Sequence, residues 1–302
     1  MKKIVVLGSM NMDLTILADP FPEKGETVTG SGYAEVPGGK GANQAVAVGR
    51  MGADINFISA CGNDGFGDSL LEELKKSNVK TDNIIRMNTH TGIALIVREA
   101  DGDNRIILAA GANAKILPSM VETLKSTIEE ADFLLLQLEI PLETVEYAAS
   151  IAKKSKTTVI LDPAPAVKLS DELLSNVDYL LPNEHELDLV LGNITGTLAG
   201  KAEMLFKKGV GTLILTEGSK GVSIFSGSNK IKIDAPKTNA VDTTAAGDTF
   251  AGAFAYGLAM NWDIQMSAEF AVKAASLSVT KVGAQSSIPW LKEVEEISRK
   301  TR

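Results

Sequence analysis

The chain has 302 residues, of which 44% are apolar and 23% charged, and its formal net charge is −8. This length is enough for a large core in one or two domains, and the negative charge argues against nucleic acid or an acidic membrane as a partner. The single cysteine, Cys61, excludes an internal disulfide framework and, because it follows an apolar run, is expected to be a buried thiol. No apolar run reaches the ~18 residues of a membrane span, and the N-terminus has no signal-peptide pattern, so we expect a cytoplasmic enzyme.

The N-terminal part of the chain predicts one buried strand and a small exposed sheet. The β-branched run Ile4–Leu7 is typical of a buried parallel strand. Between about 14 and 37, apolar and polar residues alternate loosely and are interrupted by prolines and glycines, which suits short strands. A second pair of strands is expected within about 90–110, joined by the turn signal Asp101–Asp103. We expect these segments to form one small sheet inserted outside the main body.

The remainder of the chain alternates strands and helices. Helices are expected at 40–51, 68–77, 118–130, 142–153, 184–191, 198–208, 246–259, 266–281 and 290–299. Strands are expected at 55–60, 133–138, 159–161, 179–181, 213–216, 222–225 and 231–233. This alternation predicts a three-layer α/β/α sandwich with a mainly parallel central sheet. Because no repeat, low-complexity tract or linker interrupts it, residues 1–302 are expected to form a single α/β domain that carries the small sheet as a lid.

Several common site motifs are absent from the sequence. There is no G-x-x-x-x-G-K-[ST] loop, and no G-x-G-x-x-G follows the first strand, which disfavours P-loop and dinucleotide-binding enzymes. His90 and His185 are far apart and lack metal-ligand spacing, so both are expected to be surface or supporting residues.

A polar turn that becomes a small-residue helix, Ala240–Ala253, predicts an anion site. The small residues Ala245, Ala246 and Gly247 allow a ligand to approach the backbone, and the first N–H groups of a helix attract anions. Asp248 lies in the first helical turn. It is either a residue favoured there by the helix dipole or a catalytic base beside a phosphate cradle, and the spacing alone leaves both interpretations open.

Polar groups gather where other predicted strands end. Because open α/β sheets bind ligands at the carboxyl ends of their strands, an amide and a carboxylate after the first strand are suited to hold hydroxyl groups. Paired glycines in the next loop permit close backbone approach, and a glutamate ends a later buried strand. The residues concerned are Asn11, Asp13, Gly39, Lys40, Asn43 and Glu139. Ordinary turn residues and an exposed strand-end glutamate are the alternative interpretation.

Two long motifs carry a family resemblance. Gly38–Ala45 (GGKGANQA) and Asp242–Ala253 (DTTAAGDTFAGA) resemble the two signatures of the ribokinase family of carbohydrate kinases, which also includes adenosine kinases and bacterial fructokinases. The match extends from Gly8 to Pro289. It implies ATP-dependent phosphorylation of D-ribose at O5 to give ribose 5-phosphate. A sister kinase for deoxyribose, another pentose or a nucleoside stays open, as does a non-catalytic sugar-binding protein, although the intact Asp248 argues against the latter.

The resemblance also implies a role for each matching residue. Asp248 would accept the proton of the primary sugar hydroxyl, while backbone N–H groups of Ala245, Ala246 and Gly247 stabilise the phosphoryl group in transfer. The sugar would be bound by Asn11, Asp13, Gly39, Lys40, Asn43, Glu139 and Asp248. The nucleotide would be bound by Asn183, Thr216, Gly218, Gly221 and Gly247, although residues 216–221 also suit a plain strand-to-hairpin turn.

Two metal sites are implied in the same way. Asn183–Glu186 matches an N-x-x-E motif in which Glu186 organises Mg²⁺ through water, although a plain helix N-cap would look the same. A K⁺ site is implied at Asp242, Thr244, Ser278, Lys281, Gly283 and Ser287. The alternative is a loop that only closes the last helices. Asp162 departs slightly from the pattern, because members of the family often carry Asn at this position.

The small sheet is expected to close over the sugar, and its uncovered edge invites pairing with a second copy of the chain. The resemblance implies a homodimer formed through these lid sheets. The expected ligands are a small-molecule sugar and ATP, and neither nucleic acid nor a membrane is expected as a partner.

Overall fold

The computed structural model describes residues 2–99 and 104–300. The predicted turn at Asp101–Asp103 lies outside these residues. In the part of the chain that is described, no helix combines the length and the apolar character needed to cross a bilayer.

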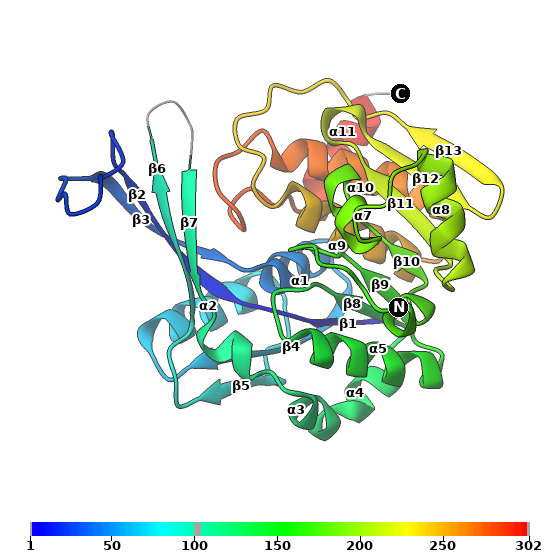
Figure 1. Ribbon diagram of the computed structural model, residues 1–302, viewed down its shortest axis with the longest axis horizontal. Coiled ribbons are helices and arrows are strands. Elements are labelled where there is room, and N and C mark those ends of the chain that lie inside the picture. The colour runs from blue at the N-terminus through cyan, green and yellow to red at the C-terminus, as the bar shows by residue number, and fades with distance from the viewer. Residues whose placement is uncertain (1, 100–103, 301–302) are drawn as a thin grey trace.

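The main sheet has nine strands in the order β13-β12-β11-β10-β9-β8-β1-β4-β5 (Figure 1). Neighbouring strands run parallel from β11 to β5, and β12 and β13 are added antiparallel at one edge. In this order the strands are Asn229–Ile233, Val222–Ser226, Thr212–Thr216, Tyr179–Leu180, Thr158–Leu161, Phe133–Leu136, Lys3–Leu7, Asp54–Gly62 and Ile84–Met87. The predicted mainly parallel sheet is therefore confirmed, with β5 as a strand that the sequence did not indicate.

The sheet divides the core into two apolar layers. Along β1, Ile4 and Val6 pack into one layer while Val5 and Leu7 pack into the other, as the two-residue period of a strand requires. The first layer is covered by α1 (Lys40–Arg50), α2 (Gly65–Lys76), α9 (Ala246–Ala259), α10 (Ile264–Ser278) and α11 (Leu291–Lys300). The second is covered by α3 (Pro118–Thr123), α4 (Lys125–Glu129), α5 (Leu142–Ser155), α6 (Asp171–Ser175), α7 (Glu184–Val190) and α8 (Leu198–Lys207). The fold is the three-layer sandwich that the sequence predicts.

The sequence did not indicate α6, the helix expected at 68–77 begins at Gly65, and two further predicted helices differ in extent from the structure. The helix expected over 118–130 is interrupted at Leu124, whose φ of −110° and ψ of 14° lie outside the helical region, so α3 and α4 are separate. The helix expected to end near 281 ends at Ser278, because the carbonyl of Val279 accepts the N–H groups of Val241 and Asp242. This contact joins the last helices to the loop before α9.

A second, four-stranded sheet projects beyond the main body (Figure 1). Its order is β3 (Ser31–Gly38), β2 (Asn11–Leu17), β6 (Gly92–Arg98) and β7 (Asn104–Ala109). The predicted small sheet is therefore confirmed. It begins earlier than expected, since Asn11 and Asp13 lie within β2 rather than in a loop, and their two-residue spacing places both side chains on one face of the strand.

Candidate active site

Asp248 is buried in the first turn of α9, with 4% of the residue exposed. The helix follows Ala245, whose φ of 60° is a left-handed conformation that non-glycine residues adopt at a cost. The Ala246 N–H donates to the carbonyl of Thr243 at 3.2 Å and so closes the turn. A side chain at Gly247 would meet open space, so a ligand can approach the backbone there.

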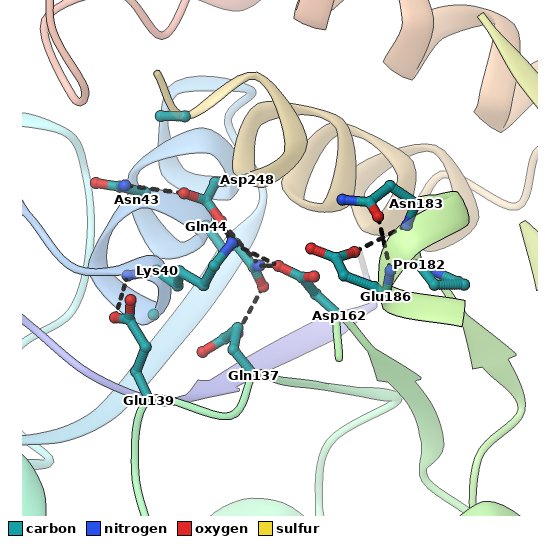
Figure 2. Close-up of polar contacts among 12 residues, drawn as sticks. Lys40, Asn43, Gln44, Gln137, Glu139, Asp162, Pro182, Asn183, Glu186 and Asp248 are labelled. Carbon is teal, nitrogen blue, oxygen red and sulfur yellow. Dashed lines mark hydrogen bonds and ion pairs between the residues drawn. The ribbon is translucent and has the colours of Figure 1, made fainter. Parts of the chain in front are cut away.

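The two signature segments meet at Asp248 (Figure 2). The Asn43 amide Nδ2 donates to Asp248 Oδ2 at 2.9 Å, and the Lys40 ammonium lies 3.5 Å from Oδ1. Small residues make this approach possible, because a Cβ at Gly252 would lie 2.5 Å from the Cβ of Ala47 on α1. Helices α1 and α9 therefore cross closely enough for short side chains to bridge them.

A second buried carboxylate, Asp162, faces the same group of donors. Lys40 Nζ lies 3.4 Å from Asp162 Oδ2, and Gln44 Nε2 donates to the same oxygen at 2.8 Å and to Asp248 Oδ1 at 3.3 Å. Gln137 Nε2 in turn donates to Gln44 Oε1 at 2.5 Å. Burial raises the pKa of Asp162 above its ordinary value; Lys40 opposes this rise, and Asp248 adds to it.

Gln44, Gln137 and Asp162 are residues of this site to which the sequence motifs assign no role. Gln44 follows Lys40 by four residues and therefore shares its helix face, which is a signal that could have been used. Gln137 precedes Glu139 at a strand end, but nothing in the sequence indicates that it reaches α1.

Lys40 is the cation shared by the acidic groups of the site. Burial lowers the pKa of its ammonium, but neighbouring carboxylates outweigh that effect and hold the pKa above the ordinary lysine range. The carboxylates are Asp162, Asp248, Glu139 and Glu186. Lys40 therefore stays charged and offsets the repulsion among them.

A cavity of about 370 Å³ lies below the small sheet, and Asn11 and Glu139 are among the residues that line it. Glu139 Oε2 accepts hydrogen bonds from Ser9 Oγ at 2.5 Å and from the Lys40 N–H at 3.0 Å. Gly39, with a φ of 87°, precedes α1 and requires a residue without a side chain, because a Cβ there would lie 2.7 Å from the Asn11 N atom. The structure thus brings the predicted sugar-binding loops together.

Asp13 is a carboxylate of this region whose pKa is shifted. Burial, with a smaller contribution from Glu139, raises the pKa of the Asp13 carboxyl to about 7. The backbone of Gly38 lies directly against that carboxyl, since a Cβ there would approach Asp13 Oδ2 to 2.4 Å.

A larger cavity of about 560 Å³ opens at the N-terminus of α9. All five predicted nucleotide-binding residues line it, namely Asn183, Thr216, Gly218, Gly221 and Gly247. The predicted strand-to-hairpin turn is present as well, as a short 3-10 turn over Gly218–Lys220 between β11 and β12. Apolar side chains such as Val222 and Phe250 complete the wall, so the cavity can hold a flat ring next to an anion-binding helix end.

Asn183 and Glu186 form a capping box at the start of α7. Asn183 Oδ1 accepts the Glu186 N–H at 2.8 Å, and Glu186 Oε2 accepts the Asn183 N–H at 2.8 Å. The N-cap interpretation is therefore correct, and it leaves Glu186 Oε1 for another role. The Glu186 carboxylate points toward Asp162 in Figure 2. Within residues 2–99 and 104–300, no group of three or more His, Cys, Asp or Glu residues forms a metal cluster.

The loop before α9 lies against the loop after α10. Asp242 Oδ1 accepts the Thr244 N–H at 2.9 Å, and Oδ2 accepts the Gly283 N–H at 3.0 Å. Burial raises the pKa of Asp242, but the hydrogen bond from the Thr244 hydroxyl at 2.6 Å, the two N–H bonds and the nearby Arg98 guanidinium outweigh it and hold the pKa below its ordinary value. The buried hydroxyl groups of Ser278 and Ser287 donate to Ala275 and Ala284 carbonyls nearby in sequence. The predicted K⁺ ligands thus come from two adjoining loops, while Lys281 Nζ pairs with Glu293.

Together these features define a class of protein: an α/β enzyme with a buried carboxylate in the first turn of a helix, one cavity at that helix end, and a second cavity at the loops joined to the carboxylate through Lys40. The family model described as "pfkB family carbohydrate kinase" matches residues 1–291. A protein named ribokinase from Lactococcus lactis subsp. lactis is 44% identical over 296 residues, which cover 98% of this chain and 96% of the relative. The chain belongs to the pfkB family of carbohydrate kinases.

Solved structures agree with this assignment. A ribokinase from Thermotoga maritima superposes with a TM-score of 0.93 at 39% identity, covering 99% of this chain and 100% of that chain. The Arabidopsis thaliana ribokinase complexed with ribose and ATP gives a TM-score of 0.92 at 34% identity, covering 98% of each chain.

Proposed function

We propose that this protein transfers the γ-phosphate of ATP to O5 of D-ribose and releases ribose 5-phosphate and ADP. One observation carries the proposal: a continuous path of contacts links the two cavities. Glu139 lines the smaller cavity and accepts the Lys40 N–H, the Lys40 ammonium pairs with Asp248, and the neighbouring Gly247 lines the larger cavity. The names of relatives about 40% identical over nearly the whole chain support the same substrate pair.

In the proposed mechanism Asp248 accepts the proton of the ribose O5 hydroxyl as the bond between O5 and the γ-phosphorus forms. The bond from that phosphorus to the bridging oxygen breaks, and ADP leaves. Because a carboxylate is a weak base, it accepts the proton late, when the hydroxyl is already losing it to a largely dissociative transition state. Backbone N–H groups at Ala245–Gly247 and the Lys40 ammonium stabilise the charge on the phosphoryl group, with the Ala246 N–H shared with Thr243.

The residues present suit an ATP-bound Mg²⁺ ion, which would supply charge neutralisation at the phosphates. Mg²⁺ keeps several waters and needs few protein ligands, so one acidic side chain is sufficient. In our proposal Glu186 holds a metal-bound water through Oε1, while Asn183 lies near the phosphates.

We also propose that K⁺ binds between the two loops around Asp242 and Gly283. Such an ion would lie outside the active site, since its ligand residues line neither of the two cavities. Its oxygen ligands would come from Asp242, Thr244, Ser278, Lys281, Gly283 and Ser287. The loop that it fixes leads directly into the anion-binding turn at Ala245.

The small sheet completes the proposed enzyme. Residues 1–302 would form one domain in which this sheet closes over the sugar. Large apolar side chains are exposed on it, among them Tyr33 at 61%, Ile106 at 54% and Ile107 at 65% exposure. Because exposed apolar surface of this kind marks interaction sites, we propose that the sheets of two copies pair to form a homodimer.

A sugar panel assayed with ATP and Mg²⁺, with and without K⁺, tests the proposal. Ribose should give the highest kcat/KM, and K⁺ should increase it. Better turnover of 2-deoxyribose, another pentose or a nucleoside would assign a sister kinase instead. Sugar binding in calorimetry without turnover of any sugar would identify a non-catalytic binding protein.

A second test uses the raised pKa of Asp13. An ionised carboxylate accepts hydrogen bonds from sugar hydroxyls, so the affinity for ribose should rise with pH and level off above about 7. We expect ribose to bind about tenfold more weakly at pH 6 than at pH 8, measured by calorimetry without ATP. Asp13→Asn should bind weakly with a flat profile. A wild-type profile that is flat over this range would contradict the role of Asp13.

A further inference from the structure

Asn113 lies directly behind Asn11, in the 3-10 helix Gly111–Lys115, and is only 2% exposed. Its Oδ1 accepts the Met10 N–H at 3.1 Å, and its Nδ2 donates to the Met10 carbonyl at 3.1 Å. The same Nδ2 donates to Asn11 Oδ1 at 2.7 Å. This side chain therefore connects the backbone at the end of β1 to the first side chain of β2.

The backbone fixes the orientation of both amide groups. The oxygen and nitrogen of an amide side chain are usually assigned from their partners, since either orientation has the same shape. Here the Met10 N–H can only donate and the Met10 carbonyl can only accept, so Asn113 has one possible orientation. Its second Nδ2 hydrogen then meets Asn11 Oδ1, and the Nδ2 group of Asn11 is left for a ligand.

The contact needs the glycine at position 92. Gly92 pairs with Asn11 in the register of β2 and β6. A Cβ at this position would lie 2.2 Å from Asn11 Oδ1 and 2.2 Å from Asn113 Nδ2. Three segments from different parts of the chain thus converge on one amide pair, and Asn11, Asn113 and Glu139 all line the 370 Å³ cavity.

The chemistry of the cavity makes this orientation matter. Among the described residues that line this cavity the charged one is Glu139, and Asp13 shares a face of β2 with Asn11. Both are carboxylates, which only accept hydrogen bonds when ionised. A sugar hydroxyl has a single hydrogen, so a hydroxyl that donates to a carboxylate must accept from its next partner. Asn11 satisfies that need only when it presents Nδ2, since a reversed Asn11 would add another acceptor competing for the same hydrogen.

We infer that Asn113 is a positioning residue that determines sugar specificity: it fixes Asn11 as a hydrogen-bond donor to a sugar hydroxyl. The inference rests on the proposed ribose phosphorylation and takes the hydroxyl bound by Asn11 to be the one at position 2 of the sugar. Asn113 acts through Asn11, and the orientation that it gives Asn11 leads the enzyme to prefer ribose over 2-deoxyribose.

The test compares kcat/KM for ribose and 2-deoxyribose in wild type, Asn113→Asp and Asn11→Asp. In Asn113→Asp the amide of Asn11 turns to donate to the new carboxylate and presents its oxygen to the sugar. Asn11→Asp keeps the hydrogen bond from Asn113 Nδ2 and, like Asn113→Asp, presents an oxygen to the sugar. Both variants should lower the ratio of kcat/KM for ribose to kcat/KM for 2-deoxyribose by about 10–100-fold. The decrease should come from kcat/KM for ribose alone.

A double-mutant cycle separates this role from a structural one. When Asn11 is Ala, adding Asn113→Asp should change the ratio by less than about twofold, because the residue that Asn113 positions is gone. Asn88→Asp, the same change at an exposed site, should keep the wild-type ratio. Circular dichroism checks folding, and if Asn113→Asp does not fold, Asn11→Asp decides the question.

Two outcomes would overturn the inference. A folded Asn113→Asp enzyme with the wild-type ratio would show that Asn113 does not set the orientation of Asn11. An Asn11→Asp enzyme with the wild-type ratio would show that the orientation does not matter. A wild-type protein that fails to phosphorylate ribose would overturn the proposed function together with this inference, whereas the two outcomes above leave the function intact.

Discussion

Replacing Asp248 by Asn is expected to lower kcat for ribose phosphorylation by about 10²–10⁴-fold, the usual contribution of a general base. Asparagine has the same shape and can still accept the hydrogen bond from Asn43 Nδ2, which is 2.9 Å from Oδ2 in the wild type. It cannot take up the O5 proton. The KM for ribose should therefore change much less than kcat, as steady-state assays of ADP release will show.

The control must remove a helix-end carboxylate that has no catalytic role. Asp171 lies in the first turn of α6, is exposed and pairs with Lys208. Asp171→Asn should leave kcat unchanged and cost at most a few tenths of a kcal/mol of stability, since exposed dipole and ion-pair effects are small. Equal turnover by wild type and Asp248→Asn would show that Asp248 is only a residue favoured by the helix dipole.

Lys40→Met is expected to cost both activity and stability. It removes the cation that lies 3.4 Å from Asp162 and 3.5 Å from Asp248 while keeping an unbranched side chain about as long as the aliphatic part of lysine. We expect kcat/KM for ribose to fall by at least about 10²-fold, because a positioned charge on the phosphoryl group is lost. The free energy of unfolding should fall by about 1–3 kcal/mol at pH 8, below the range for fully buried pairs because Lys40 is 27% exposed.

The pH dependence of that stability loss identifies its cause. The raised pKa of Lys40 means that wild type keeps its stabilising charge throughout the range from pH 5 to 9. The pKa of Asp162 is raised by burial, so stability falls as pH rises from its unfolded pKa to its folded pKa. Without Lys40 that folded pKa rises further, and the decline continues to higher pH.

The deficit of Lys40→Met relative to wild type should therefore be larger at pH 8.5 than at pH 5.5, in urea denaturation followed by circular dichroism. Lys125→Met, which breaks an exposed pair with Glu129 on α4, should show a small deficit at both values. A Lys40→Met deficit that does not change with pH would show that altered packing of the side chain, and not the loss of its charge, was responsible.

Much of the fold and of the candidate site could be predicted from sequence. Apolar side chains that recur every second residue marked most strands, and apolar side chains at helical spacing marked most helices. Burial repeats in this way because the backbone geometry of each element sets the direction of its side chains. The glycine-rich segment at Gly38–Ala45 and the small-residue helix at Asp242–Ala253 identified both loops, since close backbone approach restricts residue type locally. The five predicted nucleotide-binding residues also lie in short local segments of the sequence, and all of them line one cavity.

Only the tertiary structure shows how these segments are joined. Gln137 and Asn113 carry no local signature, and neither the signature around Gln44 nor the sequence around Asp162 shows which partner these residues meet. Each of the four contacts a partner more than 90 residues away. Which partner they meet depends on the strand order that places β8 beside β1 and β9 beside β8, and on the close crossing of α1 over α9. The sequence by itself determined which residues could bind a phosphate or a hydroxyl group, because that is local chemistry. The packing of distant segments decided which carboxylate is paired, which amide donates and which group is left free for a ligand, because a hydrogen bond requires both partners to be within about 3 Å.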